Sequence, residues 1–96
     1  MKVTVIARFR VVAGGEEHAL RAAEAAVAAT RLEDGCLNYD LHQSAGDSRD
    51  FMFHENWRSR EDLDRHAKSD HIAAWRDAVG HVLDGTFDIT LWHELD

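Results

Sequence analysis

Apolar and polar residues alternate in four stretches of the chain, and a period of two predicts a strand with one buried face. The stretches are residues 2–12, CLNYDLHQ (36–43), DFMFHENW (50–57) and TFDITLWHEL (86–95). The second and third are separated by SAGDSR, a loop of turn-forming residues short enough for a hairpin. We therefore predict four strands, of which the middle two are antiparallel neighbours.

Between these strands, apolar residues recur at the spacing of helices. An alanine-rich helix follows Gly14 and Gly15 and ends near Asp34 and Gly35, since glycine is a common helix stop. Its apolar stripe is Leu20, Ala23 and Val27. From Ser59 onward we predict two short helices with a break near Ser69 and Asp70. The apolar stripe of the last helix is Ile72, Trp75, Val79 and Val82.

The resulting order, β-α-β-β-α(α)-β, predicts an α+β fold of the ferredoxin-like, split βαβ type. In that arrangement the helices cover one face of an antiparallel sheet. A chain of 96 residues is long enough for one hydrophobic core and too short for two. We expect a single domain over residues 1–96.

The two faces of the predicted sheet differ in character. The odd-numbered positions form an apolar face that we place under the helices: Phe9, Leu37, Tyr39, Leu41, Phe53, Trp57, Phe87, Ile89 and Leu91. The even-numbered face is mixed, yet it carries Ile6, Met52 and Trp92. A second copy of the sheet packed on that face would remove them from water, so we predict a homodimer. The alternative is a hydrated face with three stray apolar residues.

Composition narrows the range of partners. Acidic residues outnumber Lys and Arg by 18 to 11, the formal net charge is −7, and no basic stripe is present. We therefore expect no nucleic acid and no membrane as a partner, and a small neutral or weakly acidic ligand instead. The sequence shows no signal-peptide pattern and no run of about 20 apolar residues, which favours a cytoplasmic protein. The single Cys36 agrees with a reducing compartment, and we expect it to be a small buried hydrophobe.

Glu55 is chemically out of place on the helix-covered face, which it shares with Phe53 and Trp57. Removal of its carboxylate from water raises the pKa unless a cation or hydrogen bonds compensate. Glu55 is therefore a candidate catalytic residue. The other interpretation is a buried ion pair with an arginine or histidine of the covering helices.

Two histidines of the segment after Ser59 are candidates for acid-base chemistry. His66 lies three residues after Leu63, beside the apolar stripe, and His71 lies at the break between the two short helices. Each alone fits a packed, hydrogen-bonded structural role, but together with Glu55 they form a plausible acid-base group, because histidine titrates near neutral pH. The catalytic candidates are therefore His66, His71 and Glu55.

Aromatic residues on the same face are candidate walls of a pocket, although aromatics that face a core more often serve packing. If the hairpin pairs residues whose numbers sum to about 96, Tyr39 is the cross-strand neighbour of Trp57, and His42 is the neighbour of His54. The substrate-binding candidates are Tyr39, Phe53, Trp57 and Trp75. No dinucleotide fingerprint, phosphate loop or metal-ligand spacing such as HExxH is present, so we expect no cofactor and no metal.

The segments EDGCLNYDLH and FMFHENWRSREDLDRHAKSDH, followed by a final strand, resemble the antibiotic biosynthesis monooxygenase (ABM) family, most closely its quinol monooxygenase-like branch. The resemblance implies a dimeric α+β barrel with a ligand cavity between sheet and helices in each subunit. It also implies oxygenation of electron-rich phenols without metal or flavin, in which deprotonated substrate itself passes an electron to O2. The protein then has to deprotonate the substrate, orient it and exclude water.

Matching positions refine this resemblance. Trp57 corresponds to the pocket tryptophan of anthrone-oxidising members, whereas Phe53 and Leu63 replace their asparagine and tyrosine. In the haem-degrading branch the strand asparagine, helix tryptophan and iron-binding histidine are matched here by Ala7, His66 and Arg76, which argues against haem. Two hypotheses follow: a cofactor-free monooxygenase that oxidises a quinol or polyphenol with O2, or a non-oxygenase with the same fold, either a small-molecule isomerase or a dimeric ligand-binding protein.

Overall fold

The strands form one antiparallel sheet in the order β2-β3-β1-β4. In this computed structural model, which describes residues 1–96, the strands are β1 (Val3–Arg10), β2 (Cys36–Gln43), β3 (Asp50–Trp57) and β4 (Asp88–Trp92). The helices are α1 (Glu16–Thr30), α2 (Arg60–Ala67) and α3 (Asp70–Gly80). The element order and the ferredoxin-like α+β fold are as predicted, including the break between α2 and α3.

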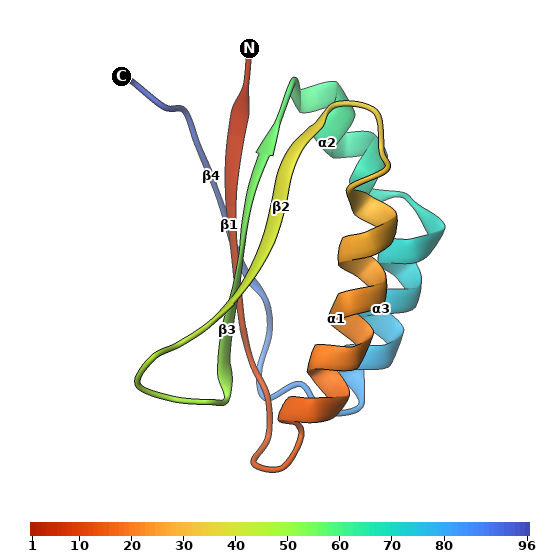
Figure 1. Ribbon diagram of the computed structural model, residues 1–96, viewed down its shortest axis with the longest axis vertical. Helices are drawn as coiled ribbons and strands as arrows, with labels where there is room; N and C mark the ends of the chain where they lie inside the picture. The colour runs from red at the N-terminus through yellow and green to blue at the C-terminus, as the bar shows by residue number, and fades with distance from the viewer.

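All the helices lie on one side of the sheet, and the other side is bare (Figure 1). The two termini lie at the same end of the sheet. The core between the layers is a cluster of 15 buried hydrophobic residues, drawn mainly from the odd-numbered positions of β1 and β3 and the inner faces of α1 and α3. Alternation in the strands therefore selects the buried face correctly.

The hairpin register differs by two residues from the predicted one. Tyr39 pairs with Glu55, whereas Trp57 pairs with Cys36. The register shifts between Cys36 and Asn38, a β-bulge that turns Leu37 outward, and Leu37 is 57% exposed. The prediction that Leu37 lies under the helices is wrong for this reason.

The same register separates two histidines that we expected to lie side by side. His42 pairs with Met52, and His54 pairs with Asp40. The two rings therefore occupy diagonal positions on the even-numbered face, and the predicted direct pairing is wrong.

The alanines of α1 form its buried stripe. Its buried residues are Ala19, Ala23, Ala26 and Thr30, while Leu20 is 41% exposed. Small side chains at these positions let the helix lie close to the layer beside it. The helix ends at Thr30, earlier than predicted, and Gly35 then takes a positive φ of 87° in the turn into β2.

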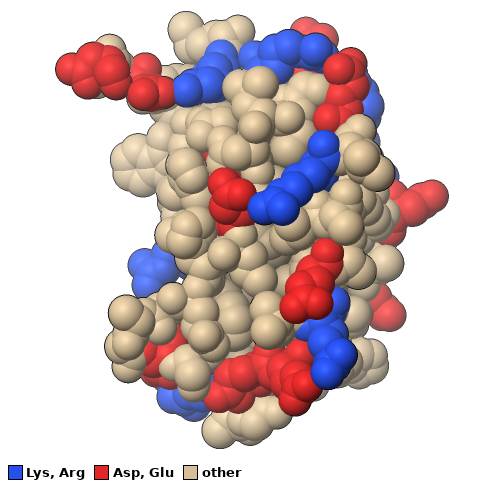
Figure 2. Space-filling model, viewed as in Figure 1, with Lys and Arg blue, Asp and Glu red and all other residues tan.

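Charged side chains are distributed over the surface, and on the face in Figure 2 acidic groups accompany the basic ones without a continuous basic patch. None of the helices has the length and apolar character needed to span a membrane.

Candidate functional site

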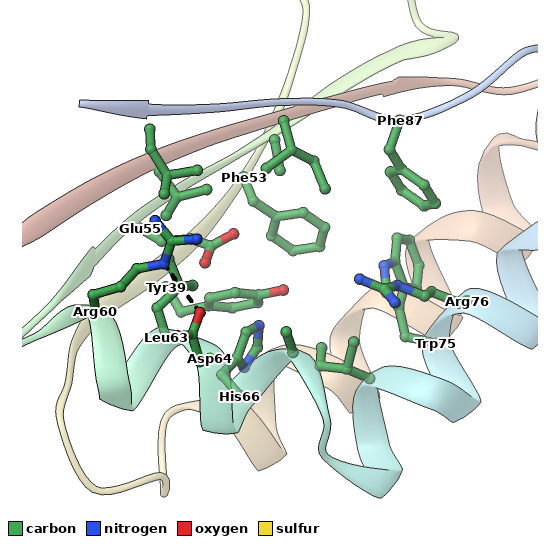
Figure 3. Close-up of a pocket in the computed structure, with 16 residues that line it drawn as sticks. Tyr39, Phe53, Glu55, Arg60, Leu63, Asp64, His66, Trp75, Arg76 and Phe87 are labelled. Atoms are coloured by element: carbon green, nitrogen blue, oxygen red, sulfur yellow. Dashed lines mark hydrogen bonds and ion pairs between the residues drawn. The ribbon is translucent and has the colours of Figure 1, made fainter.

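A cavity of about 190 Å³ lies between the helix-covered face of the sheet and the helices α2 and α3. Its walls are mostly hydrophobic, with polar side chains from β2, β3, α2 and α3 directed into it (Figure 3). The strands contribute odd-numbered positions, which alternation directs to this face, and the helices contribute their inner edges.

The structure brings most of the predicted site residues to this cavity. Tyr39, Phe53, Glu55, His66 and Trp75 line it. Two predicted members, Trp57 and His71, are absent from the lining. Trp57 is fully buried behind Glu55 and His66, and His71 lies behind His66, at the start of α3.

Glu55 is 4% exposed and forms no ion pair, so the interpretation of a buried salt bridge is wrong. Its Oε1 accepts a hydrogen bond of 2.9 Å from Nε1 of Trp57. Burial raises the pKa of Glu55 to about 7, because the hydrogen bond from Trp57 only partly offsets the loss of hydration and the negative charge of Glu33 adds to the rise. Near neutral pH this carboxyl can therefore both hold and release a proton.

His66 is 6% exposed and directs its ring into the cavity (Figure 3). Its Nδ1 lies 2.6 Å from Oε2 of Glu33. A carboxylate can only accept, so Nδ1 carries the proton and Nε2 is left as an acceptor in the neutral ring. Burial lowers the pKa of His66, although Glu33 acts in the opposite direction, and the neutral ring is therefore favoured at pH 7.

Glu33 is the residue that sequence reasoning missed. It lies in the turn after α1, and the same Oε2 that contacts His66 is 3.1 Å from Nε2 of His71. Nε2 of His71 also lies 3.2 Å from Oγ of Ser69. His71 therefore helps to fix the Glu33 carboxylate in contact with His66. No local pattern in the sequence distinguishes Glu33 from the neighbouring acid Asp34.

The start of α2 is fixed by an ionic network that positions His66. Ser59 caps the helix, and its Oγ accepts from the backbone N–H of Asp62 at 3.2 Å. The Asp62 carboxylate accepts from Arg58 at 3.0 Å and from Arg65 at 2.9 Å. Hydrogen bonds from Arg58 and then from Ser59 hold the pKa of Asp62 down at about 2, so this network stays ionised at neutral pH.

Tyr39 is a buried wall of the cavity. Its ring packs at a tilt against Phe53, with centroids 4.8 Å apart, and meets His66 edge-on, with centroids 5.3 Å apart. Burial raises the pKa of the Tyr39 phenol, which therefore remains protonated and able to donate a hydrogen bond.

Residues 2–78 match the family model described as antibiotic biosynthesis monooxygenase. The chain belongs to this ABM family. A protein of Mycobacterium tuberculosis named "Putative monooxygenase Rv0793" is 41% identical over 95 residues, a match that covers 98% of this chain and 92% of the relative.

Solved structures agree with this assignment. The structure of Rv0793 superposes with a TM-score of 0.93 at 35% identity, covering 100% of this chain and 97% of that chain. PA3566 from Pseudomonas aeruginosa superposes with a TM-score of 0.92 at 34% identity, covering 99% and 95%. A "Putative antibiotic biosynthesis monooxygenase" from Nitrosomonas europaea, at 23% identity, shares the fold with a TM-score of 0.95 and covers 98% and 90%.

One cluster, which reaches the cavity only through His66, also has the composition of a metal site. The nearest ligand atoms of Glu33, His66 and His71 lie within 4.8 Å of one another. The 2.6 Å and 3.1 Å contacts to Oε2 of Glu33 are hydrogen-bond distances, so shared protons account for the cluster without an ion. The absence of a metal remains a prediction.

Cys36, in contrast, does not line the cavity. It is partly buried, and burial raises the pKa of its thiol to about 11. A thiol that stays protonated is a poor nucleophile.

Proposed function

We propose that the protein is a cofactor-independent monooxygenase that oxidises a quinol or polyphenol with O2. The observation that carries this proposal is the Glu33–His66 pair at the edge of a mostly apolar cavity, with Nδ1 of His66 held 2.6 Å from the carboxylate. Membership of the ABM family and the similarity to Rv0793 support it.

In the proposed reaction His66 is the base. Its Nε2 accepts the proton of a substrate hydroxyl, and the Glu33 carboxylate stabilises the imidazolium that forms. The quinolate then passes an electron to O2, and the two radicals combine to form a C–O bond. Loss of water leaves a hydroxyquinone, so quinol plus O2 gives hydroxyquinone plus water.

The other cavity residues orient the substrate and complete the proton transfers. Phe53, Tyr39 and Trp75 provide the aromatic walls, and Glu55, whose pKa is about 7, donates the proton that leaves with the departing oxygen. Trp57 acts on the site indirectly, through its hydrogen bond to Glu55.

We also propose that the working unit is a cytoplasmic homodimer of one-domain subunits. The bare side of the sheet in Figure 1 is the face that carries Ile6, Met52 and Trp92, and Trp92 is 57% exposed. A second sheet on this face would form the dimeric barrel that the family resemblance implies.

A second function is favoured by two groups that line the cavity, His66 and Glu55. In the cavity the neutral ring of His66 can accept a proton and Glu55 can release one near pH 7, which is also what an isomerase needs to move a proton between two carbons. Such an enzyme would consume no O2, and this difference separates the two functions.

Oxygen uptake tests the proposal. Purified protein treated with EDTA is mixed with a panel of hydroquinones, and O2 consumption is followed with an electrode. We expect uptake to persist without metal. No uptake with any quinol, together with proton exchange into a bound hydroxyketone, would favour the isomerase.

Variants test the base. His66→Gln should reduce turnover by at least about tenfold, since a positioned base contributes roughly 10² to 10⁴ in rate. Glu33→Gln should also reduce turnover by at least about tenfold, because an amide can donate to Nδ1 and move the ring proton to Nε2. His81→Gln, at the exposed end of α3, is the matched control. Full activity of both His66→Gln and Glu33→Gln would refute the assignment.

A further inference from the structure

Two arginines reach the cavity from opposite sides in Figure 3, Arg60 from α2 and Arg76 from α3. Arg60 is neutralised on its own helix, because its Nε donates to Oδ1 of Asp64 at 3.0 Å. Arg76 forms no hydrogen bond and no ion pair with any side chain, although the chain has 18 acidic residues. The positive charge of Arg76 is therefore available to a ligand.

The position of Arg76 on α3 places it at the edge of the buried stripe. The buried residues of α3 are Ile72, Trp75 and Val79, and Arg76 follows Ile72 by four positions. At that spacing a side chain stands above Ile72 on the cavity side of the helix. Ile72, Trp75 and Phe87 also line the cavity, so the wall near Arg76 is largely apolar, while Arg76 itself is exposed to solvent.

The charge of Arg76 reaches the polar centre of the cavity. The pKa of His66 is lowered mainly by burial, and Arg76 adds to that lowering. The pKa of Tyr39 is raised mainly by burial, and Arg76 opposes that rise. The guanidinium and the two rings line the same cavity, which agrees with both effects.

We propose that Arg76 binds an anionic group of the substrate, so that the preferred ligand is a phenol or quinol that carries a carboxylate. The carboxylate lies against Arg76, and the hydroxylated part of the ring lies toward His66 and Glu55 on the other side of the cavity. A planar carboxylate matches the two-pronged guanidinium, whereas Lys offers only a point charge. The identity of the ring rests on the proposed function, but the preference for an anion does not.

Binding without turnover tests the proposal. Isothermal titration under nitrogen compares 2,5-dihydroxybenzoate with its methyl ester, which has the same ring and no charge. We expect the acid to bind at least about tenfold more tightly, as is typical of a hydrogen bond between two charged groups.

Variants assign the effect to Arg76. Arg76→Met should abolish the preference for the acid over the ester, and Arg76→Lys should retain part of it. Arg21→Met, on the exposed side of α1, should leave the preference unchanged. Circular dichroism of each variant confirms the fold.

The proposal is overturned if acid and ester bind wild type equally, if the acid shows no binding at millimolar concentration, or if Arg60→Met rather than Arg76→Met removes the preference. A preference for the acid combined with no O2 uptake would overturn the proposed oxygenation and leave the anion site standing. Uptake of O2 without any preference for the acid would overturn the anion site and leave the proposed oxygenation standing.

Discussion

Glu55 is a carboxyl whose buried environment favours its protonated form. It is 4% exposed, has a single hydrogen-bond donor in Trp57, and has a pKa of about 7. Because the folded-state pKa is above the unfolded value, the folded protein binds the proton more tightly. Glu55 therefore causes no loss of stability below about pH 4.5, and the loss develops as pH rises from about 4.5 to 7 and is complete above the folded-state pKa.

This linkage predicts how Glu55→Gln changes stability. The wild type should lose up to about 3 kcal/mol of unfolding free energy through Glu55 between pH 5 and pH 8, and the glutamine variant should not. Glutamine keeps an oxygen that can accept from Trp57. His66, with a lowered pKa, has the opposite effect at acid pH in both proteins, so the difference between them isolates Glu55.

Urea titrations at pH 5 and pH 8 measure this effect. Glu61→Gln, an exposed carboxyl on α2, is the control and should follow the wild type. An unfolding free energy of Glu55→Gln that varies with pH as much as that of the wild type would contradict the assigned pKa.

Single residues also show where sequence reasoning reaches its limit. Glu55 could be predicted because it interrupts an apolar alternation, and His66 because it lies beside a helical stripe. Glu33 could not, because its 2.6 Å contact with His66 joins residues 33 apart, and only the path of the turn after α1 brings them together. Arg76 was not predicted as part of the cavity wall, because it is a charged residue next to the apolar stripe of α3 and not a member of it.

Among the elements, α2 depends on a close contact with the turn before β2. Gly35 has a φ of 87°, and a Cβ at this position would lie 2.3 Å from Cγ of Asp62. Asp62 is the carboxylate that binds Arg58 and Arg65 at the start of α2. The turn and the helix can approach each other only because residue 35 is glycine.

Gly35→Ala should therefore destabilise the protein by at least about 2 kcal/mol, since positive φ and the collision with Asp62 both oppose an alanine. It should also lower activity, because displacement of α2 moves His66. Gly46→Ala, in the hairpin loop, has a normal φ and its nearest neighbour is 4.0 Å away, so it should have little effect. Thermal unfolding of the two variants makes the comparison, and equal melting temperatures would refute the role of Gly35.

The elements themselves were predictable to a large extent. Strands β2 and β3 match the predicted stretches from end to end, because alternation and a short polar loop define both. Their register was not predictable, because the bulge between Cys36 and Asn38 adds a residue to one strand that no pattern marks. In the predicted stripe of helix α1, Ala23 is buried and Val27 is partly buried, but Leu20 is 41% exposed and Ala19 and Ala26 are buried instead, because close packing against the neighbouring layer decides which edge of the helix is inward.

At the scale of the molecule, the two faces of the sheet differ: one packs against the helices, and the other packs against nothing within a single chain. The helices cover the odd-numbered face and enclose the cavity, while the even-numbered face stays bare (Figure 1). On that face Thr4 donates a hydrogen bond to Asn56, and Asn56 donates one to Asn38, so these three polar side chains already have partners within one chain. The apolar residues beside them, with Trp92 57% exposed, are then free to form a contact.

We therefore predict that the protein sediments as a dimer at micromolar concentration and that Trp92→Glu shifts it to a monomer. The substitution removes a large apolar contact and places two carboxylates at a symmetric interface, where each would be buried without a partner. Leu32→Glu is the matched control, because Leu32 is 88% exposed in the turn after α1, on the helix side of the sheet. Analytical ultracentrifugation should show a dimer for the wild type and for Leu32→Glu, and a monomer for Trp92→Glu. A monomeric wild type would refute the prediction, and a dimeric Trp92→Glu would place the interface elsewhere, since a carboxylate pair at its centre could not be accommodated.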